Sequence, residues 1–108
     1  ITNDDIAPPP PVPATLHVIK TVVNNSGGVA IAAEFNLHVK LLGVDVAGSP
    51  ATGVGAPGTL YSLAAGTYVV SEDSFAGYAS TITGDCAPSG SITLLAGEDK
   101  TCTITNDD

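Results

Sequence analysis

Three polar residues, Lys20, Glu72 and Asn106, fall within segments that have the composition of β-strands. Side chains of a strand alternate between its two faces, so residues of one parity share a face. Each of the three shares its parity with apolar neighbours: Leu16, Val18 and Val22 for Lys20, Tyr68 and Val70 for Glu72, and Cys102 and Ile104 for Asn106. The pattern therefore predicts that a Lys, a Glu and an Asn point into one core.

Such a trio has to satisfy its own polar groups, because unpaired polar or charged groups are costly to bury. Burial favours the neutral amine and the neutral acid. A neutral amine is a nucleophile, and a protonated carboxyl can polarise an amide carbonyl and shuttle protons. Attack of Lys20 on Asn106 with loss of ammonia would join the first and last strands by an isopeptide bond, with Glu72 as the catalytic acid/base. A hydrogen-bonded or salt-bridged trio without a covalent link is the alternative.

The elements that must position these residues are strands, because no segment from Ala14 onward sustains a helical period. Runs rich in Val, Thr, Ile and Tyr alternate with Gly, Pro, Asn and Asp. The predicted strands are Thr15–Val23, Glu34–Leu42, Thr59–Leu63, Thr67–Glu72, Ala79–Thr83, Ser91–Leu95 and Thr101–Asn106. The Gly43–Gly58 stretch is predicted as a long loop or as one short edge strand, Val44–Val46, between loops. About seven short strands indicate an all-β, two-sheet sandwich.

Cys86 and Cys102 are the two cysteines of the chain. An even cysteine count favours a disulfide in an exported β-domain, and the chain ends described next indicate export. The alternative is a pair of reduced, buried thiols. A metal site needs more ligands at closer spacing than the cysteines and the two histidines, His17 and His38, provide. Both histidines are interpreted as ordinary strand residues on a solvent-facing side.

The two ends of the sequence repeat each other, since Ile1-Thr2-Asn3-Asp4-Asp5 recurs as Ile104-Thr105-Asn106-Asp107-Asp108. This repeat predicts head-to-tail modules, with residues 1–5 as the end strand of a preceding module or as a strand added to another subunit. Residues 6–13 are proline-rich and predict a semi-rigid linker, so residues 14–108 form the sandwich domain. The repeat and the missing initiator Met favour a piece of a longer, exported polypeptide.

The composition excludes several classes of function. The 108 residues carry 3 Lys+Arg against 11 Asp+Glu, for a formal charge of −8, so a basic surface for nucleic acid is excluded. No apolar run approaches the roughly 20 residues of a membrane span. There is neither a nucleophile elbow nor a Gly-rich phosphate loop, so an enzyme acting on an external substrate is not expected.

Acidic residues gather at both predicted module ends, as Asp4, Asp5, Asp107 and Asp108. Carboxylates at a module junction could hold Ca²⁺ and stiffen an array. The Asp-x-Asp-x-Asp-Gly pattern of a calcium loop is missing, and solvated acids on an acidic exterior are the alternative reading. No other cofactor is predicted.

Several motifs together resemble a known family. Leu16-His17-Val18-Ile19-Lys20, then Gly66-Thr67-Tyr68-Val69-Val70-Ser71-Glu72, then Gly77-Tyr78, and then the segment from Cys102 to Asp108 are similar to the Cna-B/SpaA-like, prealbumin-like domains. These domains are repeated in surface proteins and pilins of bacteria. The resemblance implies a prealbumin-like (Cna-B type), Ig-like sandwich, and it assigns the isopeptide triad to Lys20, Glu72 and Asn106.

Together these observations predict a structural module of an extracellular bacterial fibre, pilus or surface stalk. Its partners would be copies of itself, joined as tandem modules or polymerised as subunits. The alternative is an adhesin or ligand-binding module at the cell surface, with the Gly43–Gly58 loop and the region of Tyr61 as its contact surface.

Overall fold

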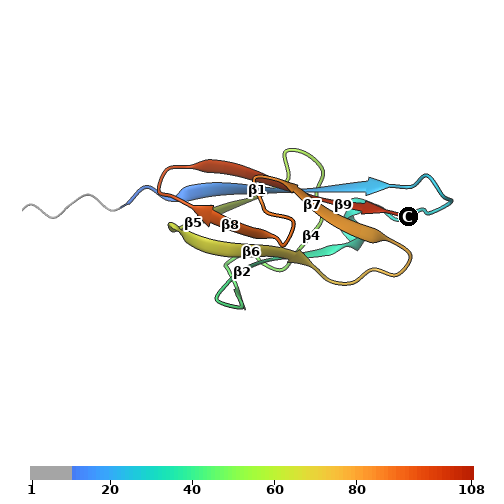
Figure 1. Cartoon of the computed structure of the whole chain (residues 1–108), viewed down its shortest axis with the longest axis horizontal. Helices are drawn as coiled ribbons and strands as arrows, with labels where there is room; N and C mark the ends of the chain where they lie inside the picture. The colour runs from blue at the N-terminus through green and yellow to red at the C-terminus, as the bar shows by residue number, and fades with distance from the viewer. Residues whose placement is uncertain (1–10) are drawn as a thin grey trace, which may run out of the picture.

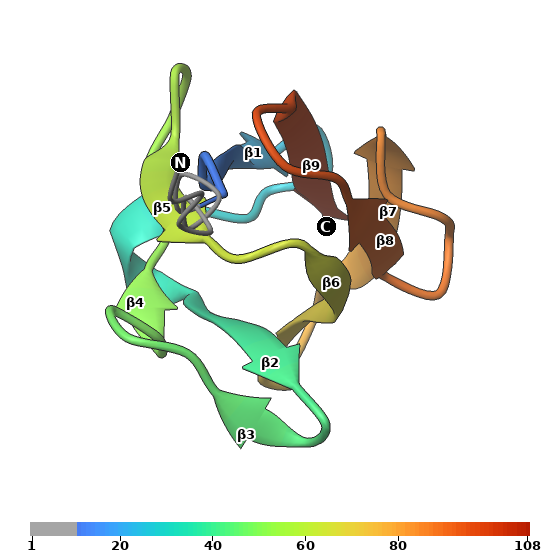
Figure 2. The same cartoon turned by 90° about the vertical axis from the view of Figure 1, so that its left-hand side faces the viewer.

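Short strands joined by tight turns make up most of the chain in the computed structural model, which describes residues 11–108. The strands are β1 (Ala14–Val23), β2 (Asn36–Leu41), β3 (Val44–Asp45), β4 (Ala51–Thr52), β5 (Thr59–Leu63), β6 (Gly66–Glu72), β7 (Ala79–Gly84), β8 (Ser91–Leu94) and β9 (Asp99–Asp107). They form one sheet of order β5-β1-β9-β7 and a second of order β3-β2-β6-β8, with β4 also paired to β2. The two sheets face each other as the layers of a sandwich (Figures 1 and 2). The predicted all-β sandwich is confirmed.

The first and last strands lie side by side in the middle of one sheet. β1 and β9 pair in parallel, with Lys20 opposite Ile104 and Val22 opposite Asn106. Because the two strands run in the same direction, the start of β1 and the end of β9 lie at opposite ends of the sandwich (Figure 1). The chain therefore enters the domain at one pole and leaves it at the other.

The core lies between the sheets and is built from alternate residues of the long strands. In β1 the side chains of Ala14, Leu16 and Val18 are buried, while the residues between them are partly exposed. β2, β6 and β9 show the same alternation, which is expected for strands with one face on a core. Lys20 and Asn106 are the buried polar residues of residues 11–108, at 2% and 1% exposure.

The strand predicted at Glu34–Leu42 is shorter in the structure, and the prediction is wrong at both ends. A single 3₁₀ turn, Ala32–Glu34, precedes it, and the Glu34 carboxylate accepts the Ile31 backbone N–H at 2.7 Å. At the other end Leu42 has a φ of 50° and begins the turn to β3, which an extended residue cannot do.

The Gly43–Gly58 stretch contains two strands, whereas at most one was predicted. β3 and β4 have two residues each, and both pair antiparallel with β2. Two-residue strands leave almost no periodicity in a sequence, so only their pairing with β2 defines them.

The predicted end strand Ile1–Asp5 and the linker residues 6–10 lie outside the described residues. Pro11, Val12 and Pro13 are exposed and precede β1 directly. Across residues 11–108, no helix is long and apolar enough to cross a membrane.

Candidate isopeptide site

Three strands bring Lys20, Glu72 and Asn106 together inside the sandwich. Lys20 comes from β1, Asn106 from the neighbouring β9, and Glu72 from the end of β6 in the opposite sheet. The side chain of Lys20 is fully buried, and that of Glu72 is 5% exposed. All three point inward, as their parity with apolar neighbours predicts.

The Glu72 carboxylate uses its two oxygens for two different partners. Its Oε2 lies 3.1 Å from Lys20 Nζ. Its Oε1 accepts a hydrogen bond of 2.7 Å from Asn106 Nδ2. Lys20 Nζ also contacts Asn106 Oδ1 directly and donates to the Ile104 carbonyl at 3.4 Å. The amine, the amide and the carboxylate thus form a closed triangle.

The surroundings of Lys20 make its ammonium easier to deprotonate. Burial lowers the pKa of its ammonium, and the hydrogen bond and charge of Glu72 oppose this effect only in part. The amine lies 4.2 Å from the centroid of the Phe35 ring. Phe35 in turn packs against Phe75 at 4.2 Å and edge-on against Tyr78 at 5.6 Å between centroids. Phe35 therefore covers the amine on one side, with Phe75 and Tyr78 packed against it.

This arrangement has the components of an amide-forming reaction within one chain. A lysine amine with a lowered pKa contacts a carboxamide, and one carboxylate touches both nitrogen atoms. Such a carboxylate can take a proton from the attacking amine and return one to the leaving nitrogen.

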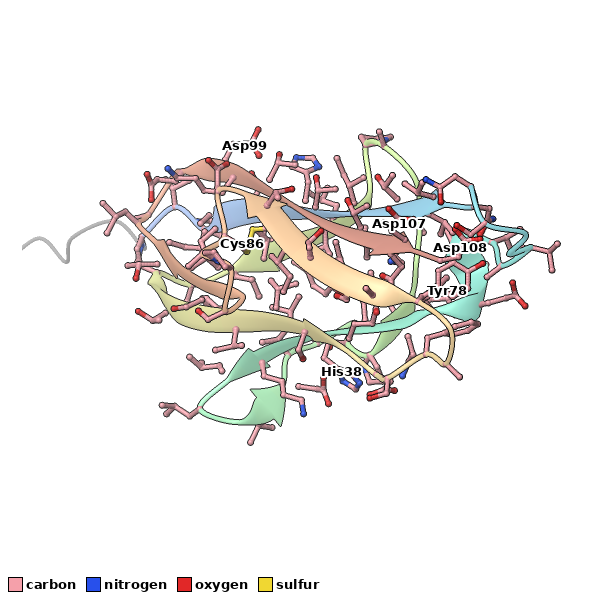
Figure 3. The ribbon with its side chains drawn as sticks, turned by 45° about the vertical axis from the view of Figure 1, so that its right-hand side comes forward. His38, Tyr78, Cys86, Asp99, Asp107 and Asp108 are labelled. Atoms are coloured by element: carbon pink, nitrogen blue, oxygen red, sulfur yellow. A yellow bond between two sulfur atoms is a disulfide. The ribbon has the colours of Figure 1, made fainter. Side chains whose placement is uncertain are left out.

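Cys86 and Cys102 form a disulfide, with a Cα–Cα distance of 5.3 Å. Cys102 is buried in β9, two residues before Ile104, and Cys86 lies in the connection between β7 and β8. The bond ties this connection to β9, an inner strand of the four-stranded sheet. Figure 3 shows Cys86 and the yellow bond within the sandwich. β9 is thus fastened near its middle, four residues before the triad residue Asn106.

The carboxylate of Asp108 holds a turn at the pole where the chain leaves. It accepts backbone N–H groups of Asn25, Ser26 and Gly28, at 2.6 to 3.2 Å. Burial acts to raise the pKa of Asp108, but these donors outweigh it and lower the pKa. Figure 3 places Asp107 and Asp108 at this tip. Asp107 is exposed, and the calcium candidates Asp4 and Asp5 lie outside the described residues.

His38 has charged partners that the sequence did not reveal. Its Nδ1 lies 2.8 Å from Asp45 Oδ1, and its Nε2 lies 2.9 Å from Asp73 Oδ1. Ionised carboxylate oxygens only accept, so a carboxylate at each ring nitrogen favours the doubly protonated imidazolium. His38 lies on the outer face of β2, the side predicted for it, but two aspartates flank the ring and leave the side chain 14% exposed.

The same contacts shift three pKa values. The hydrogen bond with Asp45 is the largest cause that raises the pKa of His38, burial opposes it, and Asp73 adds to the rise. The pKa of Asp45 is lowered first by the Ser49 hydroxyl and then by His38. That of Asp73 is lowered first by the Asn36 amide and then by His38. His17, in contrast, has one contact of this kind, 3.1 Å from Asp99.

Tyr61 does not contribute to an exposed contact surface. It lies in β5 opposite Leu16, is 4% exposed and belongs to the core. The adhesin alternative is therefore wrong in its use of Tyr61 as a surface aromatic residue.

The two-sheet sandwich, with parallel terminal strands and a buried Lys–Glu–Asn triangle between the layers, defines the class of the protein as a prealbumin-like β-domain. The SpaA-type family described as "Prealbumin-like fold domain" matches residues 11–104, and the chain belongs to this family. No curated protein and no solved structure matches the chain.

Proposed function

We propose that the chain is a structural module of an extracellular bacterial fibre, pilus or surface stalk, fastened internally by a Lys20–Asn106 isopeptide bond. The observation that carries this proposal is the buried contact of the Lys20 amine with the Asn106 carboxamide beside Glu72. Membership of the SpaA-type family supports the setting, because domains like these are found in bacterial surface proteins and pilins.

The bond forms in one balanced condensation. Neutral Lys20 Nζ attacks Asn106 Cγ, so the Nζ–Cγ bond forms and the Cγ–Nδ2 bond breaks. Glu72 Oε2 accepts a proton from Nζ, and the carboxyl group returns a proton to Nδ2 through Oε1. The leaving nitrogen departs as ammonia, and Glu72 regains its starting protonation state. No cofactor or external substrate takes part.

A bond at this position protects the module against tension. Tension that enters at the start of β1 would pass through the covalent bond to the end of β9. The segment between Lys20 and Asn106, which holds most of the core, is then shielded from extension. The disulfide between Cys86 and Cys102 restrains β9 a second time.

The repeated Ile-Thr-Asn-Asp-Asp motif supports a head-to-tail arrangement of modules. In this domain the motif is the end of β9 followed by Asp108, which holds the turn at the exit pole. We infer that residues 1–5 do the same in a preceding module. The eight residues 6–13 would then separate two modules by roughly 25 Å if they adopt polyproline II geometry. Polymerisation of separate subunits through residues 1–5 is the second form of this proposal.

Intact mass of the native protein after reduction tests the proposed bond. We expect a mass one ammonia below that of the reduced sequence. Lys20→Ala or Glu72→Ala should restore the full mass. Lys40→Ala is the matched control, because Lys40 belongs to the outer face of β2, and it should still lose ammonia. The full sequence mass in the native, reduced protein would refute the isopeptide bond.

The two forms of assembly differ in what the complete gene encodes. Consecutive copies of the Ile-Thr-Asn-Asp-Asp motif at domain-length spacing would support modules of one long chain. A single copy of the domain that forms filaments after purification would support separate subunits.

A further inference from the structure

A cavity of about 380 Å³ opens beside the triad, between β6 and β7. Glu72 and Asn106 are part of its lining, together with the aromatic rings of Phe75 and Tyr78. Ser80, which is exposed, lines the cavity from the β7 side. The cavity thus connects the buried site with the surface of the domain.

The strand pairing explains why the sandwich is open here. β8 pairs with β6 from Gly66 to Val69, and the Val70 N–H donates to the Gly90 carbonyl at 2.8 Å, so within residues 11–108 only the last two residues of β6 have no strand on that side. β7 is the edge strand of the opposite sheet. The cavity lies between these two strand edges, and it extends inward to Glu72.

The two nitrogen atoms of the reaction lie on different sides of the site. Lys20 is not part of the cavity lining; its side chain is fully buried, and its amine lies over the Phe35 ring. Asn106 Nδ2 is hydrogen-bonded to Glu72 Oε1, and both residues line the cavity. The nucleophile therefore approaches from the closed side, and the leaving nitrogen lies on the open side.

We propose that this cavity is the exit through which ammonia leaves when the Lys20–Asn106 bond forms. The inference rests on the proposed isopeptide bond and assigns a path to its small-molecule product. A water-sized molecule needs only about 10–15 Å³, so the cavity readily accepts ammonia. Once the product has left the site, it no longer competes with the lysine nitrogen for the amide carbon, and the bond becomes irreversible.

The rim of the cavity suits a basic, polar product. Asp73 and Ser74 are exposed lining residues at the end of β6, and Ser80 faces them from β7. The serine hydroxyls can exchange hydrogen bonds with ammonia as it leaves. The exit therefore runs from an aromatic interior to a hydroxyl-bearing mouth.

Blocking the cavity with a large side chain tests the inference. Ser80→Trp places an indole in the cavity and leaves all three triad residues unchanged. Thr81→Trp is the matched control, since Thr81 is exposed, neighbours Ser80 on β7 and does not line the cavity. The full chain is made by cell-free synthesis, samples are quenched with acid at set times, and intact mass follows the loss of ammonia. Disulfide formation and circular dichroism report folding.

We expect the wild-type protein and Thr81→Trp to lose ammonia at the same rate. Ser80→Trp should lose ammonia several-fold more slowly. Ser89→Trp, which enters the same cavity from the β7–β8 connection, replaces Ser80→Trp if the latter does not fold. A folded cavity variant that loses ammonia at the wild-type rate would overturn the exit, as would equal slowing in Thr81→Trp. Failure of the wild-type protein to lose ammonia would instead refute the proposed function.

Discussion

Replacing Lys20 with Met and Glu72 with Gln in the same chain should remove the cross-link without leaving an unpaired ionisable group in the core. Removing only one partner of a buried Lys–Glu pair costs about 3–5 kcal/mol and would hide the effect of the bond. In the double variant, Met fills the space of the lysine stem against Phe35. The glutamine amide oxygen can still accept the hydrogen bond of Asn106. The comparison with the wild-type protein then isolates the covalent bond.

The size of the effect follows from the loop that the bond closes. Lys20 and Asn106 are 86 positions apart, and the disulfide bypasses 16 of them, which leaves about 70. Closing a loop of that size in the unfolded chain stabilises the folded state by about 4.5 kcal/mol. For a domain of about 100 residues this difference corresponds to a melting temperature lower by roughly 20–35 °C in the double variant.

Denaturant unfolding of both proteins, with the disulfide intact and the mass of each sample checked, measures this difference. Lys40→Met is the control for loss of a lysine, and its unfolding midpoint should match that of the wild-type protein. The loop argument is refuted by two results together. The wild-type protein is one ammonia lighter, and its unfolding free energy nevertheless agrees with that of the double variant within the roughly 10–15% uncertainty of the extrapolation.

Three further predictions concern features outside the triad. Removing the disulfide with Cys86→Ser and Cys102→Ser opens a loop of 16 positions and should lower the unfolding free energy by about 3 kcal/mol; an unchanged denaturation midpoint would contradict it. The raised pKa of His38 should contribute stability that is complete below about pH 6.5 and is lost as pH rises through the folded pKa. The lowered pKa values of its two aspartate partners should contribute stability that is lost as pH falls below about 4. His38→Gln should flatten the alkaline decline in a series of denaturation midpoints, and a decline identical to that of the wild-type protein would exclude this source. Gly90→Ala should destabilise the domain by more than about 1 kcal/mol, because φ is +89° and the new Cβ would lie 1.9 Å from a β6 carbonyl oxygen. Gly55→Ala is the control, since its Cβ would meet no described atom within 4 Å, and equal melting temperatures of the two variants would contradict this contrast.

The strands and the burial of the triad were accessible from the sequence because they depend on local alternation. Lys20 follows Leu16 and Val18 at even spacing, so its direction is determined once the segment is extended. Asn106 follows Cys102 and Ile104 in the same way. A two-sheet sandwich has one core, so three residues that face inward from different strands can meet at one site.

The ion pairs of His38 could not be predicted in this way. Parity places His38 on the outer face of β2, but its partners come from β3 and from the residue that follows β6. Which carboxylates meet the ring depends on the register of two separate pairings, and nothing in the local pattern defines that register. The hydrogen bonds between Asp108 and the turn at Asn25 could not be predicted either, because the two residues lie 83 positions apart and local alternation does not show that they meet.

The parallel pairing of β1 with β9 also determines how the domain resists being pulled apart before any covalent bond exists. Force applied to the start of β1 and the end of β9 acts along the two strands in opposite directions, so it loads their ladder in shear. All nine paired positions, from Thr15 with Asp99 to Val23 with Asp107, must then yield together. An antiparallel hairpin pulled at its two ends would instead be peeled open one pair at a time. The domain is therefore able to hold the Lys20 amine against Asn106 under load without a covalent bond between them.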